Sequence, residues 1–303
     1  MGQRPSRQAK SENPQSCDCR RDRRNRPKLN KAFQSRGANV IVVDRTFRDG
    51  DLKNVQFIKA DLELMSEAKL VAQEISQKSL DLVIFSTGII AAPIRELTTE
   101  GLESDIAVSY LNRLVILRNL LPALEKAHTN VVEKPRVFIF GFPCNGETGT
   151  PDDLNSEGGY NAMKTHMTTV AGNEALVFDT ARRFPGIGVY GLNPGLIKTA
   201  IRNNFLGDGL KSRIIEGVIG LMFQNSEKYA QNVVPMMTAS ELENHSPAFF
   251  DNYGKAFLSE GFPEAYVEKY ISKSEKLLAI RCLFLTSSWL SSKLAHFVCD
   301  NTD

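Results

Sequence analysis

Short apolar segments of strand length alternate with helix-length segments through the first two thirds of the chain. The predicted strands are residues 40–43, 55–60, 81–85, 136–140 and 187–192, of which the first reads Val-Ile-Val-Val. Between them, residues 66–78, 103–127 and 161–183 carry apolar side chains at helical spacing. After residue 197 the strands give way to further helices, expected at 210–223, 226–237 and 264–274. This alternation predicts an α/β fold with a doubly wound parallel sheet that helices cover on both faces.

Composition and charge divide the chain into a domain and two unlike ends. The 303 residues are 42% hydrophobic, which is enough for one large core. Residues 1–28 contain nine Lys or Arg and three acidic residues, a local net charge of +6 against +2 for the whole chain. We predict a basic disordered arm over residues 1–28, a domain over 29–280 and a C-terminal tail over 281–303. Contact of the arm with nucleic acid, an acidic partner or a targeting receptor stays open as the less favoured interpretation.

Several classes of protein are disfavoured by what the sequence lacks. The five Cys are scattered without a CxxC pair, and the four His show no metal-ligand spacing, so neither a disulfide framework nor a metal site is predicted. The start has no apolar stretch typical of a secretory signal, and no run of 18 uncharged apolar residues predicts a membrane span. A cytoplasmic location is therefore expected. For the apolar stretch 277–298, packing on its own domain or an unstructured end is favoured over contact with a membrane surface or another subunit.

Tyr160 and Lys164 form the first candidate for chemistry. They are one helical turn apart at the start of the segment 161–183, so both side chains are expected on one face. A nearby ammonium favours the phenolate, which would bring the Tyr160 pKa closer to neutral and make the phenol a general acid or base. The spacing alone arises often by chance, so other landmarks must support it.

Those landmarks occur in an order that resembles the short-chain dehydrogenase/reductase family, over residues 29–278. They are Gly37-Ala38-Asn39 before the first strand, Asp44-Arg45 after it, Asp61-Leu62, Ser86-Thr87-Gly88, Tyr160 with Lys164, and Asn193-Pro194-Gly195 with Thr199. Residues 227–230 and 266–267 are similar to a fungal-type subgroup. The resemblance implies a Rossmann-type sheet, with substrate-side helices near residues 197–263.

The resemblance also implies an NAD(P)-dependent oxidoreductase that moves hydride between a nicotinamide and a small carbonyl or alcohol substrate. Tyr160 and Lys164 would be catalytic and would also contact the cofactor. The remaining implied cofactor residues are Asp44, Arg45, Asp61, Leu62, Ser86, Thr87, Gly88, Pro194, Gly195 and Thr199. Asp44 favours NAD, whereas Arg45 and Arg48 favour NADP, so the choice stays open. A homo-oligomer is suggested by the family alone.

Three departures from the family pattern are visible. The first strand and its glycine-rich turn are missing, since the only glycine before Gly37 is Gly2. That strand is central in the family's sheet, so its loss is expected to expose two strand edges.

The other two departures concern side chains of the active site. The family's active-site Ser falls at Gly141 or Phe142, with Cys144, Asn145 and Thr148 as less favoured substitutes; the family's helix Asn falls at Ser109, with Asn112 nearby. A catalytically impaired binding or interaction protein is therefore the alternative function.

Overall fold

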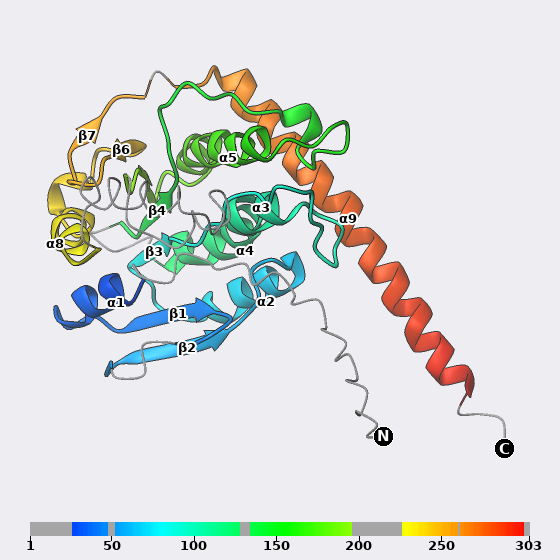
Figure 1. Cartoon of the computed structure of the whole chain (residues 1–303). Coiled ribbons are helices and arrows are strands. Elements are labelled where there is room, and N and C mark those ends of the chain that lie inside the picture. The colour runs from blue at the N-terminus through cyan, green and yellow to red at the C-terminus, as the bar shows by residue number, and fades with distance from the viewer. Residues whose placement is uncertain (1–25, 48–51, 128–133, 196–225, 260, 300–303) are drawn as a thin grey trace, which may run out of the picture.

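The computed structural model describes residues 26–47, 52–127, 134–195, 226–259 and 261–299 (Figure 1). Its strands are β1 (Val40–Asp44), β2 (Val55–Lys59), β3 (Leu82–Phe85), β4 (Arg136–Phe140), β5 (Gly188–Leu192), β6 (Ala248–Phe250) and β7 (Ala256–Phe257). Its α-helices are α1 (Arg26–Gln34), α2 (Met65–Ile75), α3 (Ser104–Ile106), α4 (Asn112–Ala127), α5 (Ala162–Arg183), α8 (Ser226–Met237) and α9 (Glu264–Cys299). A π-helical segment, η1 (Ala107–Leu111), joins α3 to α4, and η2 (Pro151–Asp153) and η4 (Ser240–Leu242) are short 3-10 turns. The α/β class predicted from the sequence is confirmed.

The strands form two separate sheets. β1 and β2 pair in parallel from Val40 opposite Val55 to Asp44 opposite Lys59. The second sheet has the order β3-β4-β5-β6-β7, and its strands are parallel except for the antiparallel pair β6-β7. Among the described residues, no strand joins β1 to β3. The break lies where the missing first strand was expected, so β1 and β3 each have one unpaired edge.

Two hydrophobic clusters cover the two faces of the interrupted sheet. Alternate residues of β4 point to opposite faces, so Val137 and Ile139 belong to one cluster and Phe138 and Phe140 to the other. The first cluster is built with α2, α4, α5 and α9, and the second with α1 and α8. The β1–β2 pair lies beside the larger sheet and is held by helix packing, α1 against α8 and α2 against α4 (Figure 1).

Helix α9 is longer than the sequence pattern predicted. The separate segments expected at residues 264–274 and 277–298 form one continuous helix, which runs across the predicted domain boundary at residue 280. Its first half packs on α5, where Tyr270 donates to the Thr168 carbonyl oxygen (2.5 Å), and its second half extends away from the rest of the fold (Figure 1). Within the described residues, no helix is both long and apolar enough to span a membrane.

Two further predictions about segments have different outcomes. Gly37 has a φ of +86° between α1 and β1, which confirms the predicted glycine that ends a helix before a buried strand. The helix predicted over residues 210–223 lies outside the described residues, as do residues 1–25 of the basic arm predicted over 1–28. Residues 26–28 of that arm begin α1 and are helical.

Candidate active site

Three loops leave one edge of the larger sheet side by side. β3, β4 and β5 are parallel neighbours, so the segments that begin at Ser86, Gly141 and Asn193 start next to one another. The predicted cofactor residues in these loops are Ser86, Thr87, Gly88, Pro194 and Gly195. Thr199 lies outside the described residues. The carboxyl ends of parallel strands are where ligands bind in open α/β sheets, which makes this edge the candidate site.

A buried arginine from α4 joins two of these loops. Arg113 is 3% exposed, and its Nη1 donates to the Phe140 carbonyl oxygen (2.5 Å) and to Asn173 Oδ1 (2.8 Å). Its Nη2 donates to the Thr87 carbonyl oxygen (2.6 Å). Burial lowers the pKa of Arg113 to about 9, and the charge of Asp105 opposes that shift. The guanidinium therefore fixes the ends of β3 and β4 against α4 and α5, a role that sequence analysis missed.

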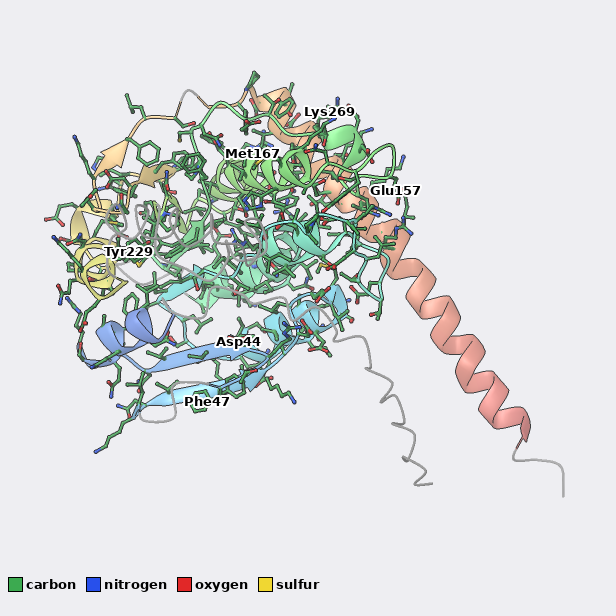
Figure 2. The ribbon with its side chains drawn as sticks, viewed as in Figure 1. Asp44, Phe47, Glu157, Met167, Tyr229 and Lys269 are labelled. Atoms are coloured by element: carbon green, nitrogen blue, oxygen red, sulfur yellow. The ribbon has the colours of Figure 1, made fainter. Side chains whose placement is uncertain are left out.

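Three of the predicted cofactor residues, Asp44, Arg45 and Asp61, meet at the end of β1. Asp44 Oδ1 accepts the Arg45 backbone N–H (2.6 Å), and Arg45 Nη1 lies 3.3 Å from Asp61 Oδ2. The Arg45 and Asp61 side chains are 35% and 29% exposed, so a ligand can reach both. Figure 2 shows Asp44 on the β1–β2 side of the molecule. This arrangement can accept a ribose hydroxyl at Asp44, while Arg45 is drawn toward Asp61.

Asn112 and Ser109, the two candidates for the family's helix Asn, both make structural hydrogen bonds. Asn112 Nδ2 donates to the carbonyl oxygens of Leu62 (2.9 Å) and Val108 (2.8 Å), which ties α4 to the loop after β2. Ser109 Oγ lies 2.5 Å from Asp105 Oδ1 and accepts the Ile89 backbone N–H (3.0 Å). Leu62 is therefore a buried anchor for α4 rather than an exposed contact surface, and Ser109 is the nearer of the two candidates to the site.

Tyr160 is half-buried, and its hydroxyl is already hydrogen bonded. The phenol donates to the Ala92 carbonyl oxygen (2.5 Å), in the loop that follows β3. Burial raises the Tyr160 pKa to about 12, and the charges of Glu103 and Asp105 add to the rise. The sequence analysis expected Lys164 to lower this pKa. That expectation is wrong, because burial and the charges of the two carboxylates dominate.

The expected placement of Tyr160 and Lys164 on one helical face is also wrong. Asn161 is the N-cap of α5, and its side chain accepts the Lys164 backbone N–H (2.9 Å), so Tyr160 lies just before the helix. The Lys164 side chain is exposed. Its Nζ makes no hydrogen bond or ion pair within the part of the chain that the structure describes.

A second ionisable group on α5 is more deeply placed than Lys164. His166 Nδ1 lies 2.8 Å from Asp105 Oδ2, and the Asp105 side chain is fully buried. Burial by itself would lower the His166 pKa, but the hydrogen bond and charge of Asp105, with the charge of Glu103, outweigh it and raise the pKa. The sequence analysis did not identify this pair, whose members are 61 positions apart.

The loop after β4 has no hydroxyl at the position of the family's Ser. Gly141 and Phe142 occupy it, and the Phe142 side chain is 50% exposed. Cys144, Asn145 and Thr148 were considered as substitutes for this Ser. The Cys144 backbone N–H donates to Glu174 Oε2 (2.7 Å), and Asn145 Oδ1 accepts the Glu147 backbone N–H (3.0 Å). Burial raises the pKa of the Cys144 thiol to about 11, which disfavours a thiolate at neutral pH. Thr148 contributes its carbonyl oxygen to the Tyr266 hydroxyl.

We expect Gly141→Ser to fold and to raise turnover. A Cβ at Gly141 would lie 3.6 Å from Asn173 Cβ, an ordinary contact, so the unfolding free energy should stay within about 1 kcal/mol of the parent. The new hydroxyl would add a donor for a substrate oxygen, and kcat/KM for the activity that the family resemblance implies should rise about tenfold or more. A Cβ at Gly191 would instead collide with the Phe249 ring, so Gly191→Ser should fail to fold. A folded Gly141→Ser variant with unchanged kcat/KM would contradict the assignment of this position.

No phosphate-binding turn is found in the described residues. Before β1 these include one glycine, Gly37, which follows a helix rather than a strand. Nor do the described residues contain a group of three or more His, Cys, Asp or Glu placed to hold a metal ion. The residues present fit the ribose of an adenosine nucleotide but supply no cradle for its pyrophosphate.

Comparison with known proteins shows the family to which the chain belongs. No family model matches the chain. An uncharacterised oxidoreductase of Saccharomyces cerevisiae is 46% identical over 256 residues, which are 82% of this chain and 83% of that protein. A short-chain dehydrogenase/reductase of Penicillium roqueforti is 24% identical over 161 residues, 52% of this chain and 47% of that one. The chain belongs to the short-chain dehydrogenase/reductase family of oxidoreductases.

Two solved structures in this family's fold illustrate the likeness. The chain matches an NADPH-bound carbonyl reductase from chicken fatty liver with a TM-score of 0.51 and 16% identity, over 76% of this chain and 94% of that one. It matches a 3-ketoacyl-(acyl-carrier-protein) reductase from Brucella melitensis, complexed with NADH, with a TM-score of 0.54 and 15% identity, over 75% and 93%. At these identities the likeness shows a shared fold.

Proposed function

We propose that this short-chain dehydrogenase/reductase is an NAD(P)-dependent enzyme that interconverts a small carbonyl compound and an alcohol, with Tyr160 as the general acid or base. The supporting observation is the position of the Tyr160 hydroxyl, which contacts Ala92 in the loop that leaves β3 at the candidate site. A phenol that contacts this loop would protonate the oxygen of a substrate bound beside the carboxyl ends of the strands.

The cofactor proposal is supported at one end of the site. Asp44 would accept hydrogen bonds from an adenosine ribose, and the loops at 86–88 and 193–195 would flank the nicotinamide end. The solved relatives named above contain NADPH or NADH, and we extend that preference to this chain as NAD(P) without a choice between the two. A bound nicotinamide would supply the hydride to the carbonyl carbon.

The proton step belongs to the chain's own residues. In the direction of reduction, the Tyr160 O–H bond breaks and a bond forms between that proton and the substrate oxygen. The phenolate then regains a proton from water. Because the hydroxyl donates to the Ala92 carbonyl oxygen (2.5 Å), a substrate oxygen must displace this contact before it can receive the proton. The pKa of Tyr160, about 12, keeps the phenol protonated at neutral pH, so the proton is present for transfer, although a phenol with a pKa closer to neutral would donate it more readily.

A second candidate function is a binding or interaction protein without turnover. It is favoured by the lack of a glycine-rich turn in the described residues and by Gly141 at the position of the family's Ser. These two changes remove a phosphate cradle and a substrate donor, respectively.

Titration with NADH and NADPH distinguishes the two functions. We expect saturable binding of at least one of them, detected by its fluorescence, and its oxidation when a panel of aldehydes and ketones is added. Asp44→Asn should weaken dinucleotide binding about tenfold, because the ribose loses a charged acceptor. Lys59→Gln, on the exposed face of β2 beside it, is the matched control and should bind like the parent. Failure to bind either dinucleotide would overturn the proposal in favour of the binding protein.

A further inference from the structure

The pair formed by His166 and Asp105 lies at the centre of a buried polar cluster. Asp105, on α3, is fully buried, and its two carboxyl oxygens contact His166 Nδ1 (2.8 Å) and Ser109 Oγ (2.5 Å). The His166 side chain is 24% exposed, so solvent reaches the imidazole but not the carboxylate. A carboxylate so deeply buried needs a compensating positive charge or several hydrogen bonds, and a protonated His166 would provide the charge.

The same short segment connects this pair to Tyr160. Ile89 is held at its backbone by Ser109, which itself contacts Asp105. Three residues later, the Ala92 carbonyl oxygen receives the Tyr160 hydroxyl. Residues 89–92 are thus fixed at one end by the carboxylate cluster and at the other by the phenol. The separation is short enough for the charge of Asp105 to act on Tyr160.

We propose that Asp105, His166 and Tyr160 form one charge-coupled unit, in which His166 is a positioning residue that controls how readily the phenol gives up its proton. When His166 is protonated, it neutralises Asp105 and the phenolate is less strongly repelled. When His166 is neutral, Asp105 keeps its full charge and opposes the phenolate. No proton passes from His166 to Tyr160 in this scheme. The proposal rests on the proposed function only for its effect on turnover.

This assignment gives His166 the electrostatic role that the family resemblance gives to Lys164. The Lys164 side chain is exposed and, among the described residues, its Nζ has no ion pair, whereas His166 contacts a fully buried carboxylate. The charge of an exposed ammonium is screened by solvent, and that of a partly buried imidazolium is screened less.

Other charged groups face the unit and must be separated from it. Glu103, which precedes α3, acts on both His166 and Tyr160, and Glu96 and Arg95 act on Tyr160. The buried Arg113 on α4 interacts with Asp105 and offsets part of its charge whether or not His166 is protonated. Burial raises the Glu103 pKa to about 7, so this carboxyl titrates in the same range as an imidazole. Glu103 Oε2 accepts the Ile106 backbone N–H (2.8 Å), and Glu103→Gln can retain that bond while removing the charge.

The first test is an NMR titration that needs no turnover. With ring-labelled His and Tyr, assigned through His166→Gln and Tyr160→Phe, the Tyr160 Cζ resonance should show a step at the pH at which the His166 imidazole titrates. The step should persist in Glu103→Gln and vanish in His166→Gln. It should also persist in His245→Gln, a control at an exposed histidine between η4 and β6. A step that survives in His166→Gln, or no step in the parent, would overturn the proposal.

The second test is the removal of the shared charge. Asp105→Asn should lower both the His166 pKa and the Tyr160 pKa, because the carboxylate raises both. An unchanged Tyr160 pKa in a folded Asp105→Asn variant would contradict the coupling. If this variant does not fold, the comparison of His166→Gln with His245→Gln still decides.

The third test is the pH profile of reduction. In the parent, kcat/KM should fall about threefold to tenfold as the pH rises through the His166 pKa, because neutral His166 no longer offsets the charge of Asp105. In His166→Gln the profile should be flat at the lower, high-pH level, with KM unchanged, and His245→Gln should keep the parent profile. A parent profile retained in His166→Gln would count against the unit. Absence of turnover in every variant would count against the proposed function instead, while the NMR step would still report on the coupling.

Discussion

Tyr160→Phe should lower kcat for carbonyl reduction at least about 100-fold while leaving dinucleotide affinity nearly unchanged. The substitution removes one oxygen, and with it the proton that the substrate oxygen would receive; general acid catalysis of this kind contributes a factor of about 100 to 10,000. Among the described residues the hydroxyl is hydrogen bonded to the Ala92 carbonyl oxygen, and the loss of that bond should cost about 1 kcal/mol of stability. The measurement is steady-state oxidation of NADH or NADPH, alongside a binding titration of the same variant.

The matched control for this variant is Tyr253→Phe, which makes the same chemical change at a side chain that is 66% exposed. We expect parental kcat there. A Tyr160→Phe variant with parental kcat would end the assignment of Tyr160 as the acid, whereas a parallel loss of binding and stability would indicate a structural role for the hydroxyl.

Arg113→Met should produce the largest loss of stability. The guanidinium is buried, and its removal leaves the Thr87 and Phe140 carbonyl oxygens and Asn173 Oδ1 without these donors. Unpaired buried acceptors cost about 1–3 kcal/mol each, and relief from burying the Arg113 charge offsets part of this sum. We expect a net loss of about 3 kcal/mol, which corresponds to a fall in Tm of roughly 6–12 °C for a domain of this size.

Urea unfolding and calorimetry measure this effect directly. Arg36→Met is the control, since the Arg36 side chain is exposed and donates only to the Ala32 carbonyl oxygen (2.9 Å), and it should unfold like the parent. An Arg113→Met variant within about 1 kcal/mol of the parent would show that the loops after β3 and β4 do not depend on this contact.

Much of the fold follows from patterns that the sequence displays locally. β4 and α8 have the predicted bounds, because a continuous apolar run and a helical repeat mark them without ambiguity. β6 and β7 were missed, since strands of three and two residues are too short to show a period. The structure has two sheets where one was predicted, because no strand lies between β1 and β3 among the described residues. The sequence already indicates this, since no apolar segment of strand length precedes α1.

The candidate site was less accessible to sequence reasoning. Asn is a strong N-cap residue, so Asn161 could have indicated that Tyr160 precedes the helix rather than lying on it. A charged residue within the apolar face of a Leu-rich helix, as at Arg113, could have signalled a buried contact. The pair of Asp105 with His166 left no local signal, because it depends on how α3 and α5 pack.

The interruption between β1 and β3 has a mechanical consequence. The β1–β2 ribbon shares no strand pairing with the rest of the described fold, so its opening breaks helix contacts but no backbone ladder to its neighbour. Local unfolding of this ribbon should therefore require less free energy than global unfolding, and its amides should exchange with solvent earlier than those of β4 and β5. Asp44 ends β1. A nucleotide bound both to Asp44 and to the loop after β3 would therefore connect the β1–β2 ribbon to the larger sheet, with which the ribbon shares no strand pairing, and would stabilise the ribbon against local unfolding.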